Sequence, residues 1–498
     1  MNKTLIFIHE TLPYKTVNMK SELENLSEFK NIFGRKELFF SVIVAAILLR
    51  LFGLGSHSLW IDEAGTASLV ETFIETGIPQ YPSGKESFRS MPHLIVTSVS
   101  VIIFGLNDFA LRIPSLIFGV MTIILVFKWA IEVFEYKTAL LSSSILAFSS
   151  WHIAMSQNAR MYAMFQFLYL STFYMAYTYI ETKDVLKILY LSVLTFLSIQ
   201  THITGYILIF TLPLYILTIS ESDMIQKITI ISAFLLFLNV GLENLSWKIM
   251  DIFEELTFYF ATLVEHLQWF GFNLPINFFL GVSGGLIGLY KNVHIFKNFL
   301  FAVVPPTVVY MFFIELPASR YLFFSLPFLA MGTSYFVKFI CETFMDNELN
   351  TYLKLSILII VIILSLGNPL NPQLGSAAPE ADFKSAYHYL GERSSQDELL
   401  IVGRSLPADH YFEKPDYVLE ERTRSKEYTV NGRDEYSNST LIGDQENLTR
   451  ITKKNKRGWI VATDIVQRGI RPELMNEIEK FELKWEGDNI DVWRWNRK

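Results

Sequence analysis

The chain has 498 residues, of which 51% are hydrophobic, 15% are aromatic and 18% are charged, and its mean hydropathy is +0.31. This composition lies outside the range of ordinary soluble domains and indicates an integral membrane protein. The single cysteine, Cys341, excludes an internal disulfide and a zinc site with several cysteine ligands. The formal net charge of −7 gives no indication of a nucleic-acid partner.

Residues 1–36 are too charged and too long for a cleavable signal peptide, so we expect a cytoplasmic tail. A helical span needs about 20 mostly apolar residues. On this criterion the sequence predicts an α-helical polytopic membrane protein with about eleven transmembrane helices. They lie at residues 37–54, 113–131, 138–155, 163–181, 186–200, 203–220, 227–243, 274–290, 298–314, 321–340 and 354–367.

Lysines set the orientation of these spans. If every predicted segment crosses once, the lysines that flank the spans fall on the side of the N-terminal tail; they include Lys36, Lys137, Lys187, Lys297 and Lys338. The positive-inside rule makes that side cytoplasmic. The outer side is nearly free of lysine, so its few charged residues are candidates for function.

The long first outer loop contains two apolar segments. Residues 63–77 have apolar residues at helical spacing, and residues 92–105 are apolar but short for a span. We expect both to be helices that lie along the outer interface. If the second segment crossed instead, all later loops would be inverted, against the positive-inside rule. A further outer segment at 243–270 is amphipathic and acidic, which also predicts a surface helix.

The composition changes near Gly367, which predicts a domain boundary there and a small α/β extracytoplasmic domain at 368–498. The periodicity predicts a helix at 381–393, short buried strands in 398–403 and 457–466, and closing strands in 480–498. Two N-x-S/T sequons begin at Asn438 and Asn447. They would be accessible on the outer side, although such sequons are common by chance.

The stretch LWIDEA places two adjacent acids, Asp62 and Glu63, directly after the first span. Adjacent residues on a helix point about 100° apart, so the two cannot share one task equally well. A partly desolvated carboxylate at the bilayer boundary suits a general base, and the other acid then has a structural role. The alternative is that both are ordinary charges of a helix N-terminus. Glu86 is the other candidate acid of this loop.

Arginine and tyrosine recur together at two outer helix ends, as Arg160 and Tyr162 in SQNARMYAMF and as Arg320 and Tyr321 in ELPASRYLFF. A guanidinium group binds a phosphate in bidentate fashion, and the alternative is an arginine that anchors a helix end by snorkelling. His202 in IQTHITGY either orients a substrate or is structural. The remaining outer candidates for substrate binding are His93, Arg89 and Lys85. The segment GVSGGLIG lies inside a span and favours helix packing over a phosphate loop.

Taken in order, five motifs resemble those of GT-C fold glycosyltransferases: LWIDEA, FALRIPSLIFGV, WHIAMSQNARMYAMF, THITGYILIF and SRYLFFSLPFLA. The most similar subset contains protein O-mannosyltransferases, aminoarabinose transferases and related bacterial and archaeal sugar transferases. The resemblance covers residues 37–340 and the arrangement of a terminal outer domain. It implies transfer, with inversion, of a sugar such as mannose from a polyprenyl- or dolichyl-phosphate carrier to an acceptor on the outer face.

In that family the first-loop acid lies at the catalytic centre, which maps to Asp62 as the base with Glu63 as the second member of the pair. Basic residues of the outer loops hold the lipid phosphate, which maps to Arg160 and Arg320. Relatives carry a charged residue before two prolines, whereas this chain has FRSMPHLI, so the second catalytic group stays open between Glu86 and His93. Some members use a divalent metal; we expect no obligate cofactor here.

Two other functional classes, and several kinds of acceptor, are alternatives at the level of the sequence. A transporter or flippase of a lipid-linked or anionic substrate would place ionisable residues in the middle of spans and would contain broken helices, whereas the charges here cluster at span ends. A non-enzymatic assembly factor would tolerate replacement of Asp62. The acceptor is equally consistent with a protein, a glycan under construction, a glycolipid or a cell-wall polymer. We expect a multi-pass protein of the plasma membrane with a cytoplasmic N-terminus and the C-terminal domain outside.

Overall fold

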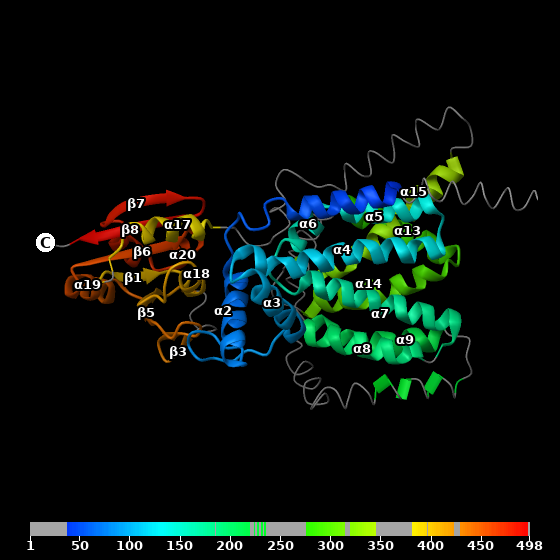
Figure 1. The fold of residues 1–498 in the computed structure, drawn as a ribbon, viewed down its shortest axis with the longest axis horizontal. Helices are drawn as coiled ribbons and strands as arrows, with labels where there is room; N and C mark the ends of the chain where they lie inside the picture. The colour runs from blue at the N-terminus through cyan, green and yellow to red at the C-terminus, as the bar shows by residue number, and fades with distance from the viewer. Residues whose placement is uncertain are drawn as a thin grey trace, which may run out of the picture.

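The computed structural model describes residues 37–184, 186–219, scattered residues between 224 and 235, and 275–313, 319–344, 381–395, 397–422 and 429–496. The predicted N-terminal tail, the surface helix at 243–270, the span at 354–367 and the boundary near Gly367 lie outside these residues, as does most of the span at 227–243. Within the described residues a helical bundle lies at one end and an α/β domain at the other (Figure 1).

The helical part begins with one helix over residues 37–51. The helices that follow are α2 (Ile61–Thr76), α3 (Met91–Phe104), α4 (Asp108–Val133), α5 (Tyr136–Phe148), α6 (Ser150–Ser156), α7 (Tyr162–Thr182), α8 (Leu186–Thr201), α9 (Leu208–Ile219), α13 (Pro275–Tyr290), α14 (His294–Phe313) and α15 (Leu326–Phe344). Short 3₁₀ segments η1 (Ile203–Ile207) and η3 (Ser319–Ser325) precede α9 and α15. The helices therefore fall close to the predicted spans.

Among the described residues, two helical stretches are long and apolar enough to cross a membrane, Asp108–Val133 and Arg320–Thr343. The pair α5 and α6, bent by 61°, would be a third. The other described helices are shorter or less apolar, so the number of about eleven spans stays a prediction.

The predicted span at 138–155 is broken at Ser149, and a buried arginine explains how the break is stabilised. Arg50 is fully buried at the end of the first helix. Its guanidinium donates to the carbonyl oxygens of Leu146 and Ala147 at 3.1 and 3.0 Å, which are left without partners where α5 ends. Beyond the break, Ser149 caps α6 by accepting a hydrogen bond from the amide of His152.

Two glycines of α13, Gly281 and Gly284, pack against α15, in agreement with the predicted helix packing. A Cβ atom at Gly284 would lie 1.9 Å from the carbonyl oxygen of Gly332, and one at Gly332 would lie 2.2 Å from the carbonyl oxygen of Gly281. Larger residues would therefore force the two helices apart. This segment is a helix-packing surface of the small-residue type found in membrane proteins.

Helix α2 crosses the end of the bundle instead of continuing it (Figure 1). Helix α3, which packs beside it, has 14 residues and is about 21 Å long, which is shorter than the hydrocarbon core of about 30 Å. Its exposed residues are apolar and include Ile95, Val99 and Ile102. Both helices therefore agree with the prediction of interfacial helices in the first outer loop.

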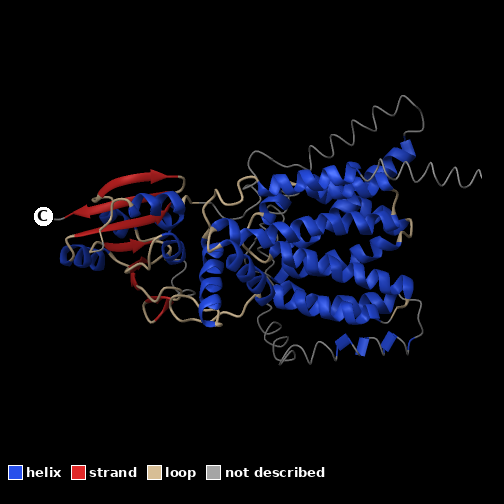
Figure 2. Ribbon diagram, in the orientation of Figure 1, coloured by secondary structure: helices blue, strands red, loops and turns tan. Residues whose placement is uncertain are grey.

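The C-terminal domain is an eight-stranded sheet with helices on both faces (Figure 2). The strands are β1 (Leu399–Val402), β2 (Tyr417–Leu419), β3 (Thr429–Val430), β4 (Arg433–Asp434), β5 (Thr440–Ile442), β6 (Arg457–Thr463), β7 (Glu482–Gly487) and β8 (Ile490–Asn496), in the order β3-β4-β5-β2-β1-β6-β8-β7. The central strands β5, β2, β1 and β6 are parallel, and the outer ones are antiparallel.

The sheet buries both faces because its strand residues alternate between two cores. Leu400 and Val402 pack with α17 (Phe383–Gly391). Ile401 packs on the opposite face with α19, α20 and α21, which span Gln445–Lys454, Asp464–Gly469 and Pro472–Ile478. A further helix, α18 (Ser405–Tyr411), follows β1. The predicted helix at 381–393 and the predicted strands are confirmed.

Candidate active site

Asp62 and Glu63 lie in the first turn of α2 and face different surroundings. The side chain of Asp62 is 38% exposed, whereas that of Glu63 is 2% exposed. The angle of about 100° between neighbouring helical residues thus separates the two acids as predicted. Asp62 is available to a ligand, and Glu63 is part of the protein interior.

Glu63 holds the start of α2 in place. Its carboxylate accepts two hydrogen bonds from the guanidinium of Arg112, at 2.9 and 2.8 Å, and one from the backbone amide of Ala159 at 2.6 Å. It also accepts a weaker bond from the amide of Trp60 at 3.3 Å. The fork of Arg112 further donates to the carbonyl oxygens of the segment 54–58. Glu63 is therefore a positioning residue, not a free acid.

Arg160 lies beside Asp62 because Glu63 holds its chain neighbour Ala159. The Nη1 atom of Arg160 donates to the carbonyl oxygen of Asp62 and to the hydroxyl of Thr66, both at 3.2 Å. Its Nη2 atom lies 4.0 Å from the Asp62 carboxylate. The buried Nε atom has no hydrogen-bond partner among the described residues, which leaves a donor for a ligand.

Arg320 brings a second guanidinium group to the same place from η3. Its Nε atom donates to the hydroxyl of Tyr162 at 3.1 Å. The guanidinium lies 5.4 Å from the ring centre of Trp60 and 5.3 Å from that of Tyr321, so cation–π contacts hold it. We call Asp62, Arg160, Tyr162, His202, Arg320 and Tyr321 the Asp62 cluster.

His202 completes this cluster as a neutral side chain. Its ring lies 5.7 Å from that of Tyr162 and 6.0 Å from that of Tyr321. Its Nδ1 atom accepts a hydrogen bond from the amide of Thr204. Burial, together with the positive charges of Arg160 and Arg320, lowers the pKa of His202 to about 3. His202 is therefore uncharged at neutral pH.

His93 on α3 is buried and shares the field of Arg160. Burial and that neighbouring positive charge lower its pKa to about 3. Its Nε2 atom has no hydrogen-bond partner among the described residues, and the same holds for the indole nitrogen of Trp60. Both groups are therefore available to a ligand; the indole N–H donates, whereas the Nε2 atom of a neutral histidine donates or accepts according to its tautomer.

The other three candidates of the first loop are more exposed. Lys85 forms an ion pair with Glu435 of the C-terminal domain, so it links the two parts of the chain. Glu86 and Arg89 are exposed.

Burial raises the pKa of Tyr81, and the positive charge of the nearby Arg89 opposes this shift. The same tyrosine interacts electrostatically with Arg160 and Asp62, so Tyr81 is a neighbour of the cluster that the motifs did not indicate.

The C-terminal domain contacts the segment that leads into Asp62. Asp108 at the start of α4 accepts hydrogen bonds from Lys384 at 2.9 Å and from the hydroxyl of Tyr411 at 3.1 Å. The same hydroxyl accepts a bond from the amide of Leu59 at 2.6 Å. Tyr411 therefore joins the α/β domain to a residue that lies three positions before Asp62. Nothing in the local sequence indicated this contact.

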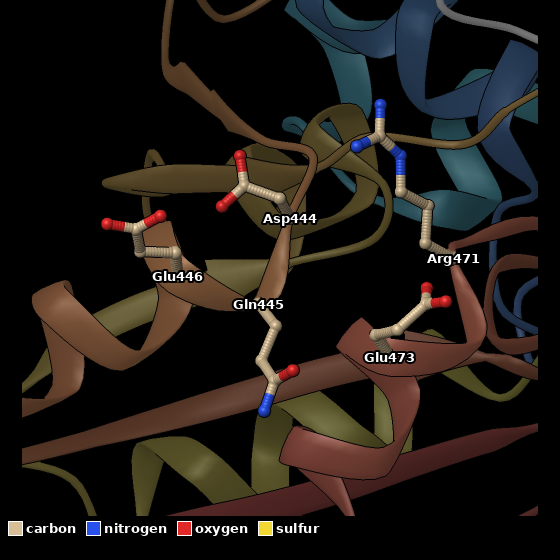
Figure 3. A pocket seen from close by; sticks show the side chains of 5 residues that line it. All are labelled: Asp444, Gln445, Glu446, Arg471 and Glu473. Carbon is tan, nitrogen blue, oxygen red and sulfur yellow. The ribbon is translucent and has the colours of Figure 1, made fainter.

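Two other kinds of site can be considered within the described residues. The described residues contain no group of three or more His, Cys, Asp or Glu side chains arranged to hold a metal ion. The expectation of no obligate metal stays a prediction. A hollow on the C-terminal domain is lined by Asp444, Gln445, Glu446, Arg471 and Glu473 (Figure 3). It contains three carboxylates and one guanidinium, which is unfavourable for an anion, and it includes no predicted site residue.

Solved structures share this architecture. ArnT from Cupriavidus metallidurans is similar over 93% of this chain and 98% of its own, with a TM-score of 0.62 and 12% identity. The chain has the GT-C fold. The same ArnT bound to undecaprenyl phosphate gives a TM-score of 0.60. The archaeal oligosaccharyltransferase AglB from Archaeoglobus fulgidus, in complex with an inhibitory peptide and a dolichol-phosphate, gives 0.53 with 13% identity, over 90% of this chain and 73% of its own.

Residues 91–247 of this GT-C protein also match a family model described as dolichyl-phosphate-mannose-protein mannosyltransferase. No curated protein sequence matches the chain at a significant level. The resemblance deduced from the motifs is thus confirmed in fold and in family domain, and with it the glycosyltransferase class. The fold match extends over the C-terminal domain, which the family model does not reach.

Proposed function

We propose that this GT-C protein transfers a sugar, with mannose as the first candidate, from a polyprenyl- or dolichyl-phosphate carrier to an acceptor on the outer face of the membrane. The observation that carries the proposal is the position of the exposed carboxylate of Asp62 beside the guanidinium groups of Arg160 and Arg320. A base next to two phosphate-binding groups is the minimum that such a transfer requires.

The reaction is a single displacement. Asp62 takes the proton of the acceptor hydroxyl, whose oxygen forms a bond to the anomeric carbon of the sugar. The bond from that carbon to the carrier phosphate breaks, and the lipid phosphate leaves with its electron pair. Because the acceptor attacks the face opposite the leaving group, the configuration at the anomeric carbon inverts.

Arg160 and Arg320 stabilise the charge that develops on the leaving phosphate. Both guanidinium groups are held by the protein before any ligand binds, Arg160 by Asp62 and Thr66 and Arg320 by Tyr162 and Trp60. Little reorganisation is therefore required in the transition state. His202 and His93 are neutral, so they add no positive charge beside the two arginines. Their rings can hydrogen-bond sugar hydroxyls or phosphate oxygens.

The orientation follows the lysine distribution: the N-terminus is cytoplasmic, and the Asp62 cluster and the C-terminal domain lie outside. The placement of α2, α3 and the C-terminal domain at one end of the bundle (Figure 1) supports a site at the membrane surface, where a lipid carrier and a water-soluble acceptor meet. The plasma membrane is the expected location.

The test is a transfer assay with the full chain in nanodiscs. Polyprenyl-phosphate mannose that is labelled in the sugar is supplied. Acceptors extracted from the outer face of the native membrane are added with it. We expect label to move to an acceptor with release of unlabelled lipid phosphate, and a product of inverted anomeric configuration by NMR. The same protein is also reconstituted into sealed vesicles. Label that stays on the lipid there but changes sides, with no transfer in nanodiscs, would instead establish the transporter alternative.

A further inference from the structure

We propose that Asn438 is an N-glycosylation acceptor, so that the outer domain of this protein itself carries a glycan. The chain has two sequons, Asn438-Ser439-Thr440 and Asn447-Leu448-Thr449. A sequon alone is a weak signal. The structure, however, presents the two sequons in very different ways, and only the first is accessible to an enzyme.

The first sequon lies in the turn from β4 into β5 with its two essential groups directed outward. Asn438 and Thr440 are exposed, whereas Ser439 between them is 5% exposed. The hydroxyl of Ser439 donates to the carbonyl oxygen of Pro415. This bond holds Ser439 inward, so its two neighbours point outward. Neither the side-chain amide of Asn438 nor the hydroxyl of Thr440 has a hydrogen-bond partner among the described residues, so both are available.

The backbone at Asn438 also favours asparagine. Its φ is +60°, in the left-handed region that asparagine adopts more readily than most residues. Its backbone nitrogen donates to the carbonyl oxygen of Asp434 at 2.8 Å. The acceptor side chain is thus held on a tight turn at the surface.

The second sequon is closed by its own helix. Asn447 lies in the first turn of α19, where its side-chain nitrogen donates to Asp444 at 2.7 Å and its side-chain oxygen accepts from Arg450 at 2.7 Å. Leu448 is fully buried. The hydroxyl of Thr449 lies close enough to Glu477 to help lower the pKa of that carboxyl group, to which Lys480 contributes most. Modification here would require α19 to unfold.

In the modification, the side-chain amide nitrogen of Asn438 forms a bond to the anomeric carbon of an oligosaccharide. The bond from that carbon to the diphosphate of a lipid carrier breaks, the lipid diphosphate leaves, and the amide loses one proton. The reagents are a lipid-diphosphate-linked oligosaccharide and an N-glycosylating transferase of the same membrane. The modification rests on the outer location proposed for the C-terminal domain but not on this chain's own activity, so the sugar-transfer assay and the glycan on Asn438 can succeed or fail separately.

The test is glycopeptide mass spectrometry on the full chain purified from its native membrane. We expect glycan on Asn438 and none on Asn447. A chain whose Asn438 is entirely unmodified, or one modified at Asn447 instead, would overturn the proposal.

Two matched pairs of variants keep the result specific. Thr440→Val removes the hydroxyl but keeps the strand, and should abolish the glycan on Asn438, whereas Thr440→Ser retains a hydroxyl and should preserve it. Thr449→Val makes the same change in the second sequon and should leave the glycan on Asn438 intact. Persistence of the Asn438 glycan in Thr440→Val would contradict recognition of this sequon.

Discussion

The carboxylate of Glu63 lies 2.6 Å from the backbone nitrogen of Ala159 and accepts its hydrogen bond. This contact joins α2 to the loop between α6 and α7. Because Asp62 precedes Glu63 and Arg160 follows Ala159, one buried carboxylate fixes the separation of the proposed base and a proposed phosphate ligand. The spacing of the candidate active site is thus set by residues that directly neighbour the proposed reacting groups in the sequence.

Replacement of Glu63 by glutamine should strongly destabilise the protein. The change leaves the buried Arg112 without its charged partner, which costs about 3–5 kcal/mol in comparable buried pairs. Thermal unfolding in detergent measures this loss. Glu75→Gln, on the same helix but at an exposed position, is the matched control. Equal unfolding temperatures for both variants would show that the Arg112 pair contributes nothing.

Arg320→Lys should raise the KM for the lipid-phosphate donor about tenfold, equivalent to about 1.4 kcal/mol. Lysine keeps the charge but loses the planar fork and its stacking on Trp60 and Tyr321. Initial rates at varied donor concentration test this effect. Arg468→Lys, on the exposed surface of α20, should leave the KM unchanged. A donor KM in Arg320→Lys equal to that of the wild type would remove Arg320 from the phosphate site.

Acid should destabilise the protein partly through His202. Its folded pKa of about 3 lies below the unfolded value of about 6.5, so the unfolded state binds the extra proton between these limits. Stability from this group is therefore complete above about pH 6.5 and falls as the pH is lowered toward 3, by at most about 1.4 kcal/mol per unit. His202→Gln should lose less stability than wild type between pH 6.5 and 4; parallel curves would contradict a neutral, buried histidine.

Tyr411→Phe should lower kcat by a factor on the order of ten and leave the donor KM nearly unchanged. The hydroxyl joins Asp108 to the amide of Leu59, and its loss frees the segment that leads into Asp62. Tyr389→Phe is the control, because the Tyr389 hydroxyl has no hydrogen bond among the described residues. If both variants keep full kcat, the C-terminal domain does not position the catalytic segment.

Local patterns predicted much of this arrangement. Hydropathy located the helices, short continuous apolar runs located β1 and β6, and the geometry of adjacent helical residues separated Asp62 from Glu63. The order of the motifs also brought Arg160, His202 and Arg320 into one expected site. These inferences succeeded because each depends on residues close together in the sequence or on the constraint that the bilayer imposes.

The contacts that fix the site depend on distant residues and could not be deduced from one sequence. Arg112 meets Glu63 across 49 positions, and Tyr411 meets Leu59 across 352. Lys85, a candidate for substrate binding, is paired with Glu435, which lies 350 positions away. No proline or glycine in the sequence indicates the break at Ser149. The hydrogen bonds that compensate for it come from Arg50, which lies on another helix.

The central claim, that Asp62 is the base of a sugar transfer from a lipid phosphate, is tested most directly by single-turnover transfer with Asp62→Asn and Glu75→Gln in nanodiscs. Asparagine keeps the size of the side chain and removes its basicity. We predict that Asp62→Asn still binds the polyprenyl-phosphate sugar but transfers it about 10²–10⁴-fold more slowly, while Glu75→Gln transfers at the wild-type rate. Transfer by Asp62→Asn at the wild-type rate would contradict the account.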